Sequence, residues 1–293
     1  MKLPFALFHN NLKRCALLAT ACLAGGLLAK GWLLFAQLQP PRFVMTHENA
    51  GRASPSEHRG GMRGTAKPLA ANPGSDPSAE ALLDGFRHVE VASVSDALEQ
   101  ITGRRMYMTH RMQPIFTAKF AGYAVTVALK KQEGHQGSQA LNGMLTAIDQ
   151  GAPDSVYVMS LEDGADIAGM GGLMGTAMSA RDFAGAVIDG GVRDTAYLRK
   201  IQFPVYALGV VPSTSANHYR FAGANIPITC DGVPVNPHDL VVADGDGVVV
   251  VPQDQEAPVL TLAQQMDFKE HSMYPVIEQH KSIEEAVRVF GRL

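Results

Sequence analysis

An adjacent arginine and aspartate are the side chains best placed to do chemistry. They close the segment 187–194, which reads VIDGGVRD. Its apolar start predicts a strand, and the paired glycines let the backbone turn sharply into a helix. Arg193 then lies at the carboxyl end of a strand, where open α/β sheets bind ligands, and its planar guanidinium suits a carboxylate. Asp194 offers oxygen ligands to Mg²⁺ or Mn²⁺. The alternative at this point is that Asp194 only caps a helix starting at Thr195 and that Arg193 is a surface residue.

A glycine-rich segment is the second candidate. Residues 169–175 read GMGGLMG and precede a predicted helix, whose first N–H groups can bind an anion. A dinucleotide site would use Asp189, about 20 residues further on, as the partner of a ribose. We disfavour that interpretation because residues 161–168 separate the glycines from the preceding predicted strand. Close packing of the helix is the other explanation for the glycines.

A third segment has the spacing of a calcium loop. Residues 239–252 read DLVVADGDGVVVVP and contain a DxDG pattern. An EF-hand also needs flanking helices and a glutamate further on. β-Branched residues surround the pattern here, which predicts a tight hairpin instead.

Composition narrows the classes of function. Hydrophobic residues make up 46% of the 293 residues and charged residues 18%, so a sizeable core can form. The net charge is -3, and no stretch gathers Lys and Arg over aromatic residues, so we expect no nucleic-acid partner. Only Cys230 lies outside the N-terminal apolar segment, so neither a disulfide framework nor a zinc cluster is expected.

The N-terminal part differs from the rest of the chain. Residues 15–38 carry a single charge and follow Lys13 and Arg14, the pattern of a signal or membrane anchor. We therefore expect residues 1–38 to be such a segment, with membrane contact through residues 15–38. The mature protein would be periplasmic, secreted or membrane-anchored; a start codon further downstream would leave it cytoplasmic. Residues 39–78, rich in proline, glycine and serine, are expected to be a disordered linker.

Residues 79–293 alternate between strand and helix patterns, which predicts one domain. Helices are predicted to start near Ala79 and, with Ser95 as N-cap, near Asp96, and to span 138–150, 175–183, 195–201, 257–270 and 282–290. Strands are predicted at 120–129, 155–160, 185–189, 205–208, 226–235 and 240–251. Alternation followed by strands in succession predicts a mixed-sheet α/β sandwich.

Several runs, in this order, together resemble one family. They are VSDAL, FAGYAVTV, GAVIDGGVRD, PVYALG and IPITCDGVPVNPHDLVVADGDGVVVVP. The chain from about residue 80 to 293 is similar to the RraA-like family, whose members include the 4-hydroxy-4-methyl-2-oxoglutarate aldolases and the RNase E regulator RraA. The resemblance implies a swivelling-domain-like α/β sandwich assembled as a homotrimer or hexamer. It also implies retro-aldol cleavage of a 4-hydroxy-2-oxo diacid to pyruvate, often with oxaloacetate decarboxylation.

The resemblance assigns roles to individual residues. The family's arginine falls on Arg193, and its metal-binding aspartate falls on Asp194, which would hold Mg²⁺, Mn²⁺ or another divalent ion. A small 2-oxo acid would be bound by the backbone of a loop that falls on Gly171, Gly172, Leu173 and Met174. A neighbouring subunit supplies an acidic residue in the aldolases, and Glu270 is the candidate by position.

Two positions depart from the aldolases. The aldolases carry an acidic residue 21 positions before the arginine, where this chain has Gly172. They usually carry Glu or Asp three residues after the metal-binding aspartate, where this chain has Tyr197. The changes can weaken metal binding or remove the base that starts cleavage.

Three functions therefore compete. A divalent-metal-dependent (class II) lyase is favoured, followed by a related enzyme such as an oxaloacetate decarboxylase and by a non-catalytic regulatory or binding protein. Arg193 and Asp194 favour the two enzymes, whereas Gly172 and Tyr197 favour the third. A Schiff-base aldolase that uses Lys130 or Lys131 is a formal alternative.

Overall fold

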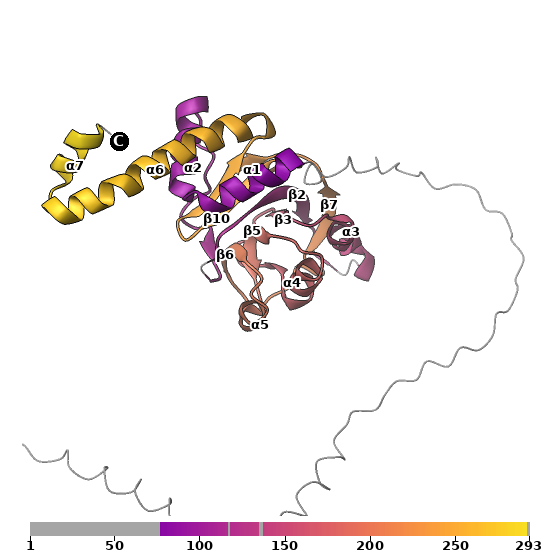
Figure 1. The fold of residues 1–293 in the computed structure, drawn as a ribbon. Coiled ribbons are helices and arrows are strands. Elements are labelled where there is room, and N and C mark those ends of the chain that lie inside the picture. Colours follow the sequence, from indigo (N-terminus) through magenta and orange to yellow (C-terminus); the bar gives the residue numbers. More distant parts are fainter. Residues whose placement is uncertain (1–76, 117, 135–136, 292–293) are drawn as a thin grey trace, which may run out of the picture. The chain divides into compact units, whose positions relative to one another are not determined.

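The computed structural model describes residues 77–116, 118–134 and 137–291 (Figure 1). The predictions of a signal or anchor in residues 1–38 and of a linker in residues 39–78 fall almost wholly outside these ranges. Within them, no helix is both long and apolar enough to cross a membrane.

The helices and strands alternate through most of the chain. The helices are α1 (Pro77–His88), α2 (Val91–Thr102), η2 (Ser138–Leu141), α3 (Asn142–Gln150), α4 (Gly172–Ser179), α5 (Thr195–Lys200), η3 (Gln253–Gln255), α6 (Glu256–His280) and α7 (Ile283–Phe290). The strands are β1 (Gln113–Pro114), β2 (Phe120–Lys131), β3 (Ser155–Leu161), β4 (Ala168–Met170), β5 (Gly185–Val192), β6 (Val205–Val210), β7 (Tyr219–Ala224), β8 (Ile228–Cys230), β9 (Val233–Val235), β10 (Leu240–Asp244) and β11 (Gly247–Val251).

A nine-stranded mixed sheet forms the centre of the domain. Its main order is β1-β6-β5-β3-β2-β10-β11, while β4 pairs with β5 and β7 pairs with β2. The strands β2, β3, β5 and β6 run parallel, whereas β1, β7, β10 and β11 are antiparallel to their neighbours. Strand β2 pairs with β10 near its start and with β7 near its end, so the sheet branches there. The predicted mixed α/β architecture is confirmed.

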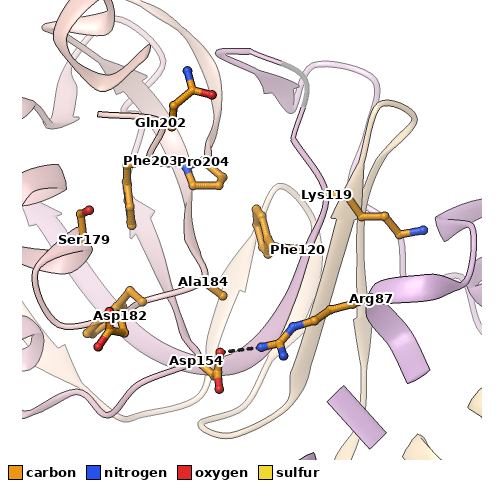
Figure 2. Close-up of a pocket in the computed structure, with 11 residues that line it drawn as sticks. Arg87, Lys119, Phe120, Asp154, Ser179, Asp182, Ala184, Gln202, Phe203 and Pro204 are labelled. Atoms are coloured by element: carbon orange, nitrogen blue, oxygen red, sulfur yellow. Dashed lines mark hydrogen bonds and ion pairs between the residues drawn. The ribbon is translucent and has the colours of Figure 1, made fainter. Parts of the chain in front are cut away.

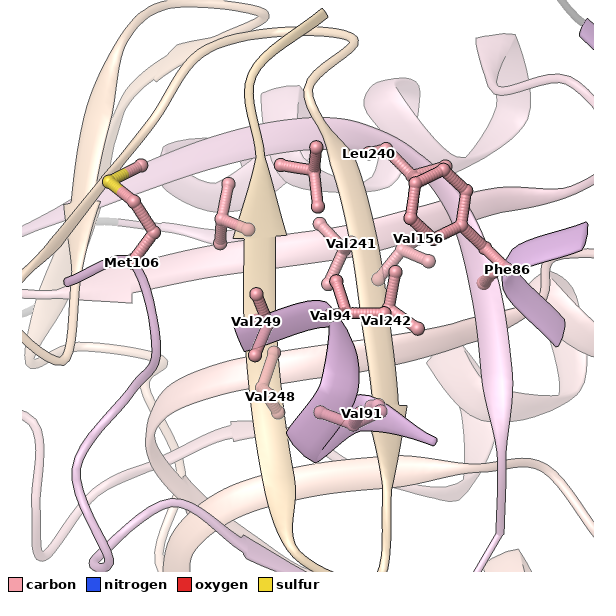
Figure 3. Packing of buried hydrophobic residues seen from close by; sticks show 14 of the residues in the cluster. Phe86, Val91, Val94, Met106, Val156, Leu240, Val241, Val242, Val248 and Val249 are labelled. Carbon is pink, nitrogen blue, oxygen red and sulfur yellow. The ribbon is translucent and has the colours of Figure 1, made fainter. Parts of the chain in front are cut away.

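Two apolar clusters fill the two sides of this sheet. One packs α1, α2 and α6 over β10 and β11, and Figure 3 shows Val91 and Val94 of α2 against valines of these strands. The other packs α3, α4 and α5 on the opposite face. Val187 points into the first cluster and Ile188 into the second, because successive side chains of a strand alternate. The end of β5 is therefore fixed from both sides.

The predicted start of α2 was wrong. Ser95 is not an N-cap, because the helix already begins at Val91. The carboxylate of Asp244, the last residue of β10, accepts the N–H of Val91 at 3.0 Å. A cap supplied from so far along the chain leaves no local signal in the sequence.

Two other helix boundaries differ from the predicted ones, whereas the predicted hairpin is confirmed. Helix α4 begins at Gly172 rather than at Gly175, and α6 continues to His280 rather than ending at Glu270. Strands β10 and β11 form an antiparallel hairpin in which Asp244 pairs with Gly247.

Candidate active site

Arg193 follows the last residue of β5, at the carboxyl end of the parallel strands. Its backbone N–H donates to the carbonyl of Met170 at 3.1 Å, which ties it to the end of β4. Its Nη1 donates to the carbonyl of Ser213 at 3.1 Å. Its Nε forms an ion pair with Oδ2 of Asp194 at 4.0 Å, and the side chain is 45% exposed, so further N–H donors of the guanidinium can reach a ligand.

Asp194 adopts the left-handed backbone conformation, with φ 59° and ψ 31°. Its side chain does not cap α5, the helix that begins at the next residue. Instead, Oδ2 accepts the N–H of Gly172 at 2.9 Å, so the carboxylate caps α4 from the connection between β5 and α5. The side chain is 52% exposed, and a carboxylate has about four lone-pair sites, so Asp194 can hold a further ligand.

The glycine loop lies directly against this pair. A Cβ at Gly171 would lie 2.6 Å from Oδ2 of Asp194 and 3.0 Å from Cγ of Arg193, so the close approach requires glycine. The carbonyl of Gly171 accepts the N–H of Gly175 at 3.0 Å. Since the first N–H groups of a helix have no acceptor within it, those of Leu173 and Met174 are donors for an anion. The structure thus brings the predicted loop and the Arg-Asp pair together.

The two departures from the aldolase pattern are neighbours in space. A Cβ at Gly172 would lie 3.2 Å from Cδ1 of Tyr197 and 3.4 Å from Cβ of Asp194. The hydroxyl of Tyr197 lies 3.5 Å from the hydroxyl of Thr176, one turn further along α4. The tyrosine ring therefore lies along the first turn of α4, beside Asp194.

Sequence reasoning missed Ser213, which lies in the loop after β6. Its hydroxyl accepts the N–H of Ala168 at 2.9 Å and donates to the carbonyl of Asp166 at 3.1 Å. Its carbonyl accepts from Arg193. Ser213 therefore joins three segments and orients the arginine, but a serine in a polar loop gives no signal of this role.

The prediction that no strand immediately precedes the glycine loop was wrong. Strand β4 ends at Met170, directly before Gly171. The case against a dinucleotide now rests on Asp189, whose Oδ2 accepts the N–H of Asp231 at 2.8 Å. Burial raises the pKa of Asp189, and this hydrogen bond opposes the shift. Asp189 fastens the turn between β8 and β9 to the sheet, which leaves it poorly placed for a ribose.

Glu270 is not part of the same chain's site. It lies on α6, on the other side of the sheet from α4 and α5, and accepts the hydroxyl of Tyr274 at 2.7 Å (Figure 1). Its predicted role in a neighbouring subunit stays a prediction.

A second group of candidate metal ligands also lies on that side of the sheet. In the part of the chain that the structure describes, one trio of acidic and histidine side chains is close enough to share an ion, and it excludes Asp194. It comprises Glu90, Asp267 and His271. Asp267 accepts the N–H of Glu90 at 3.3 Å, so this carboxylate already serves to fasten α2 to α6.

A cavity of about 470 Å³ opens at the other end of the sheet, beside the loops that precede β3, β5 and β6. Figure 2 shows the side chain of Arg87 reaching toward Asp154, with which it forms an ion pair at 2.5 Å; Lys119 and Asp182 are among the other lining residues. Its lining includes none of the residues that gather around Arg193. We place the candidate site at Arg193 because the glycine loop, the charged side chains of Arg193 and Asp194 and the N–H donors at the start of α4 lie together there.

Comparisons with known proteins agree with this architecture. A protein of Halalkalibacterium halodurans, provisionally named a 4-hydroxy-4-methyl-2-oxoglutarate aldolase, is 30% identical over 179 residues, which are 61% of this chain and 80% of that protein. The solved structure of an uncharacterized protein from Pseudomonas syringae is 28% identical, with a TM-score of 0.65, and covers 73% of this chain and 96% of its own. Streptomyces coelicolor RraAS2, described as an unusual member of the RNase ES inhibitor RraA family, shares the fold at 24% identity, with a TM-score of 0.59, over 66% of this chain and 96% of its own. The family model for Aldolase/RraA matches residues 91–250, and the chain belongs to this RraA-like family.

Proposed function

We propose that the chain is a divalent-metal-dependent carbon–carbon lyase that cleaves a 4-hydroxy-2-oxo diacid and releases pyruvate. One observation carries the proposal. A half-exposed arginine, a half-exposed aspartate and the free N–H groups at the start of α4 converge at the carboxyl end of β5. Such a set can hold a carboxylate and an adjacent carbonyl. The names of relatives support this reaction class.

The donor set fits a hard divalent cation. Mg²⁺ usually keeps several waters and takes one or two protein carboxylates together with oxygens of the substrate. Asp194 supplies one carboxylate that is open to solvent on one side. When bound there, the cation would withdraw electrons from the 2-oxo group.

The chain's own residues would do the rest. The N–H groups of Leu173 and Met174 would hold the carboxylate of the substrate. Arg193 would stabilise the negative charge that develops on the 2-oxo oxygen when the C3–C4 bond breaks and its electron pair passes to C3. The 4-hydroxyl group loses its proton in this step and becomes a carbonyl. Because Gly172 and Tyr197 replace the usual carboxylates, that proton would pass to water rather than to a side chain. A proton from water would then be added to C3, which completes the methyl group of pyruvate.

The missing carboxylates favour a second activity on the same site. Decarboxylation of oxaloacetate needs the same stabilised charge but no removal of a hydroxyl proton. We therefore expect this reaction to suffer less from Gly172 and Tyr197 than aldol cleavage does. The same two residues are also the argument for a non-catalytic regulatory or binding protein, the alternative function.

Assembly and location belong to the proposal as well. We expect a homotrimer or hexamer, in which Glu270 of a neighbouring chain would approach the site. The apolar run in residues 15–38 favours a protein outside the cytoplasm or tethered to a membrane.

Pyruvate release by the full-length chain tests the proposal. The substrates are 4-hydroxy-4-methyl-2-oxoglutarate and oxaloacetate, each with Mg²⁺ and with a chelator. We expect turnover that needs the metal and is lost in Arg193→Met. Equal rates with the chelator, or full activity of Arg193→Met, would refute it. Absence of turnover together with Arg193-dependent binding of oxalate would favour the non-catalytic alternative.

A further inference from the structure

Ser213 closes a ring of hydrogen bonds that contains both parts of the candidate anion site. Its hydroxyl accepts the N–H of Ala168, the first residue of β4, at 2.9 Å. Strand β4 ends at Met170, whose carbonyl accepts the backbone N–H of Arg193 at 3.1 Å. The guanidinium of Arg193 then donates from Nη1 to the carbonyl of Ser213 at 3.1 Å. The guanidinium and the strand that leads into the glycine loop are therefore both fixed against one residue.

The loop that carries Ser213 depends on this residue for its position. Residues 211–218 connect β6 to β7. In the middle of the loop, the hydroxyl of Thr214 accepts the N–H of Ala216 at 3.2 Å, a contact within the loop itself. Among the residues that the structure describes, the hydrogen bonds that join the middle of the loop to other segments all come from Ser213. Its hydroxyl therefore determines where the carbonyl that receives Arg193 lies.

The hydroxyl of Ser213 acts both as a donor and as an acceptor. Besides accepting the N–H of Ala168, it donates to the carbonyl of Asp166 at 3.1 Å, in the turn that precedes β4. Two hydrogen bonds thus set its position relative to β4. Ala168 is buried, so its N–H would lose this partner in a place that water does not reach freely. Alanine at position 213 removes both bonds, whereas threonine keeps the hydroxyl.

We infer that Ser213 is a positioning residue for the binding of the substrate's acid head group. Its hydroxyl holds Arg193 and β4 in a fixed relation, so that the guanidinium and the N–H groups at the start of α4 form one preformed anion site. The inference rests on the proposed function, because it concerns the same head group. Ser213 does not have to touch the ligand, since its effect passes through Arg193. A preformed site binds more tightly because fewer groups must be ordered on binding.

Binding of oxalate, which mimics the head group alone, tests the inference by calorimetry on the full-length chain with Mg²⁺. Ser213→Ala should weaken binding about 10-fold, the effect of losing about one hydrogen bond to a charged group. Ser213→Thr should stay within about twofold of the wild type, because it keeps the hydroxyl. Thr214→Val is the matched control, since it removes the neighbouring hydroxyl, whose contact lies within the loop, and should leave the affinity unchanged.

A double-mutant cycle shows whether the effect passes through the arginine. Arg193→Lys keeps the positive charge but lacks the fork that can hold the carbonyl of Ser213 and an anion together. In the Arg193→Lys protein, Ser213→Ala should therefore weaken oxalate binding by less than about twofold. Thermal unfolding checks that each variant folds, and Ser213→Cys, whose thiol is a weak hydrogen-bonding group, replaces the alanine variant if that variant does not fold.

Three outcomes would overturn the inference. A lower unfolding midpoint with wild-type affinity in Ser213→Ala would show that the serine serves the fold alone. An equal loss of affinity in the wild-type and Arg193→Lys backgrounds would show that Ser213 acts independently of the arginine. Failure of the wild type to bind oxalate would refute the proposed function together with the inference, whereas binding that does not depend on Ser213 would refute the inference alone.

Discussion

Asp194→Asn separates the two roles that the structure gives to this residue. Asparagine tolerates the left-handed conformation at φ 59°, and its amide oxygen can still accept the N–H of Gly172. What is lost is the negative charge beside the start of α4, which contributes about 0.3–1 kcal/mol at such a position. The stability of Asp194→Asn should therefore fall by less than about 1 kcal/mol.

The alanine variant should lose more stability. Alanine has no acceptor for the N–H of Gly172, a half-exposed bond worth about 0.5–1.5 kcal/mol. It also occupies the left-handed region at a cost of about 1–2 kcal/mol. Asp194→Ala should then be about 2–3 kcal/mol less stable, which lowers the midpoint of thermal unfolding by roughly 5–10 °C in a domain of this size.

The functional loss should be the same in both variants. Without the carboxylate, metal-dependent release of pyruvate should fall by about 100-fold or more, since a removed electrostatic contact of this kind costs about that much. Asp182→Asn is the matched control, because Asp182 also adopts positive φ, at 58°, but borders the cavity at the other end of the sheet. An Asp194→Asn protein with full metal-dependent turnover would show the metal assignment to be wrong. Equal stability of the alanine variant and the wild type would refute the capping argument.

Three further predictions concern the glycine loop, the two positions that differ from the aldolases, and the buried side chain of Glu256. Gly171→Ala should abolish turnover, because its Cβ would lie 2.6 Å from Oδ2 of Asp194; unchanged pyruvate release would contradict this. Gly172→Asp should raise aldol cleavage relative to oxaloacetate decarboxylation only when Tyr197→Ala is added, because the ring lies 3.2 Å from the new Cβ; a full gain in the single variant would argue against that coupling. Burial, and secondly the charge of Asp239, raise the pKa of Glu256 to about 7, so the folded state binds this proton more tightly than the unfolded state and stability should fall by about 1–3 kcal/mol as pH rises from 5 to 8. Urea unfolding should show that Glu256→Gln removes much of this decrease, and an unchanged slope would assign it to other groups.

Short apolar runs located most of the sheet in advance. The runs that became β2, β3, β5 and β6 are continuous and apolar, because these strands are buried on both faces. Their order in the sheet, by contrast, depends on pairing between segments that are distant in the sequence, and local patterns do not show it. Strand β4 escaped notice because three residues are too few to show a period.

The errors at helix ends have the same physical origin. The start of α2 was predicted at Ser95. The helix begins at Val91 instead, where the carboxylate of Asp244, far away in the chain, accepts the N–H. The candidate site shows this dependence again, since Asp194 caps α4 rather than its own helix. Sequence patterns find the strand that carries the Arg-Asp pair, but the contacts with Ser213 and Tyr197 depend on how the loops meet.

Because Asp194 has a structural role, its presence is weaker support for an enzymatic function. A chain that had lost all catalysis would still need an acceptor for the N–H of Gly172 and a residue that tolerates positive φ, and aspartate supplies both. Arg193 has a smaller structural role, because its half-exposed side chain gives one hydrogen bond to the carbonyl of Ser213 and a 4.0 Å ion pair from Nε to Oδ2 of Asp194. Arg193 is therefore the stronger argument for a bound anion. If Arg193→Met keeps the wild-type stability but loses the binding of oxalate, the arginine serves a ligand rather than the fold.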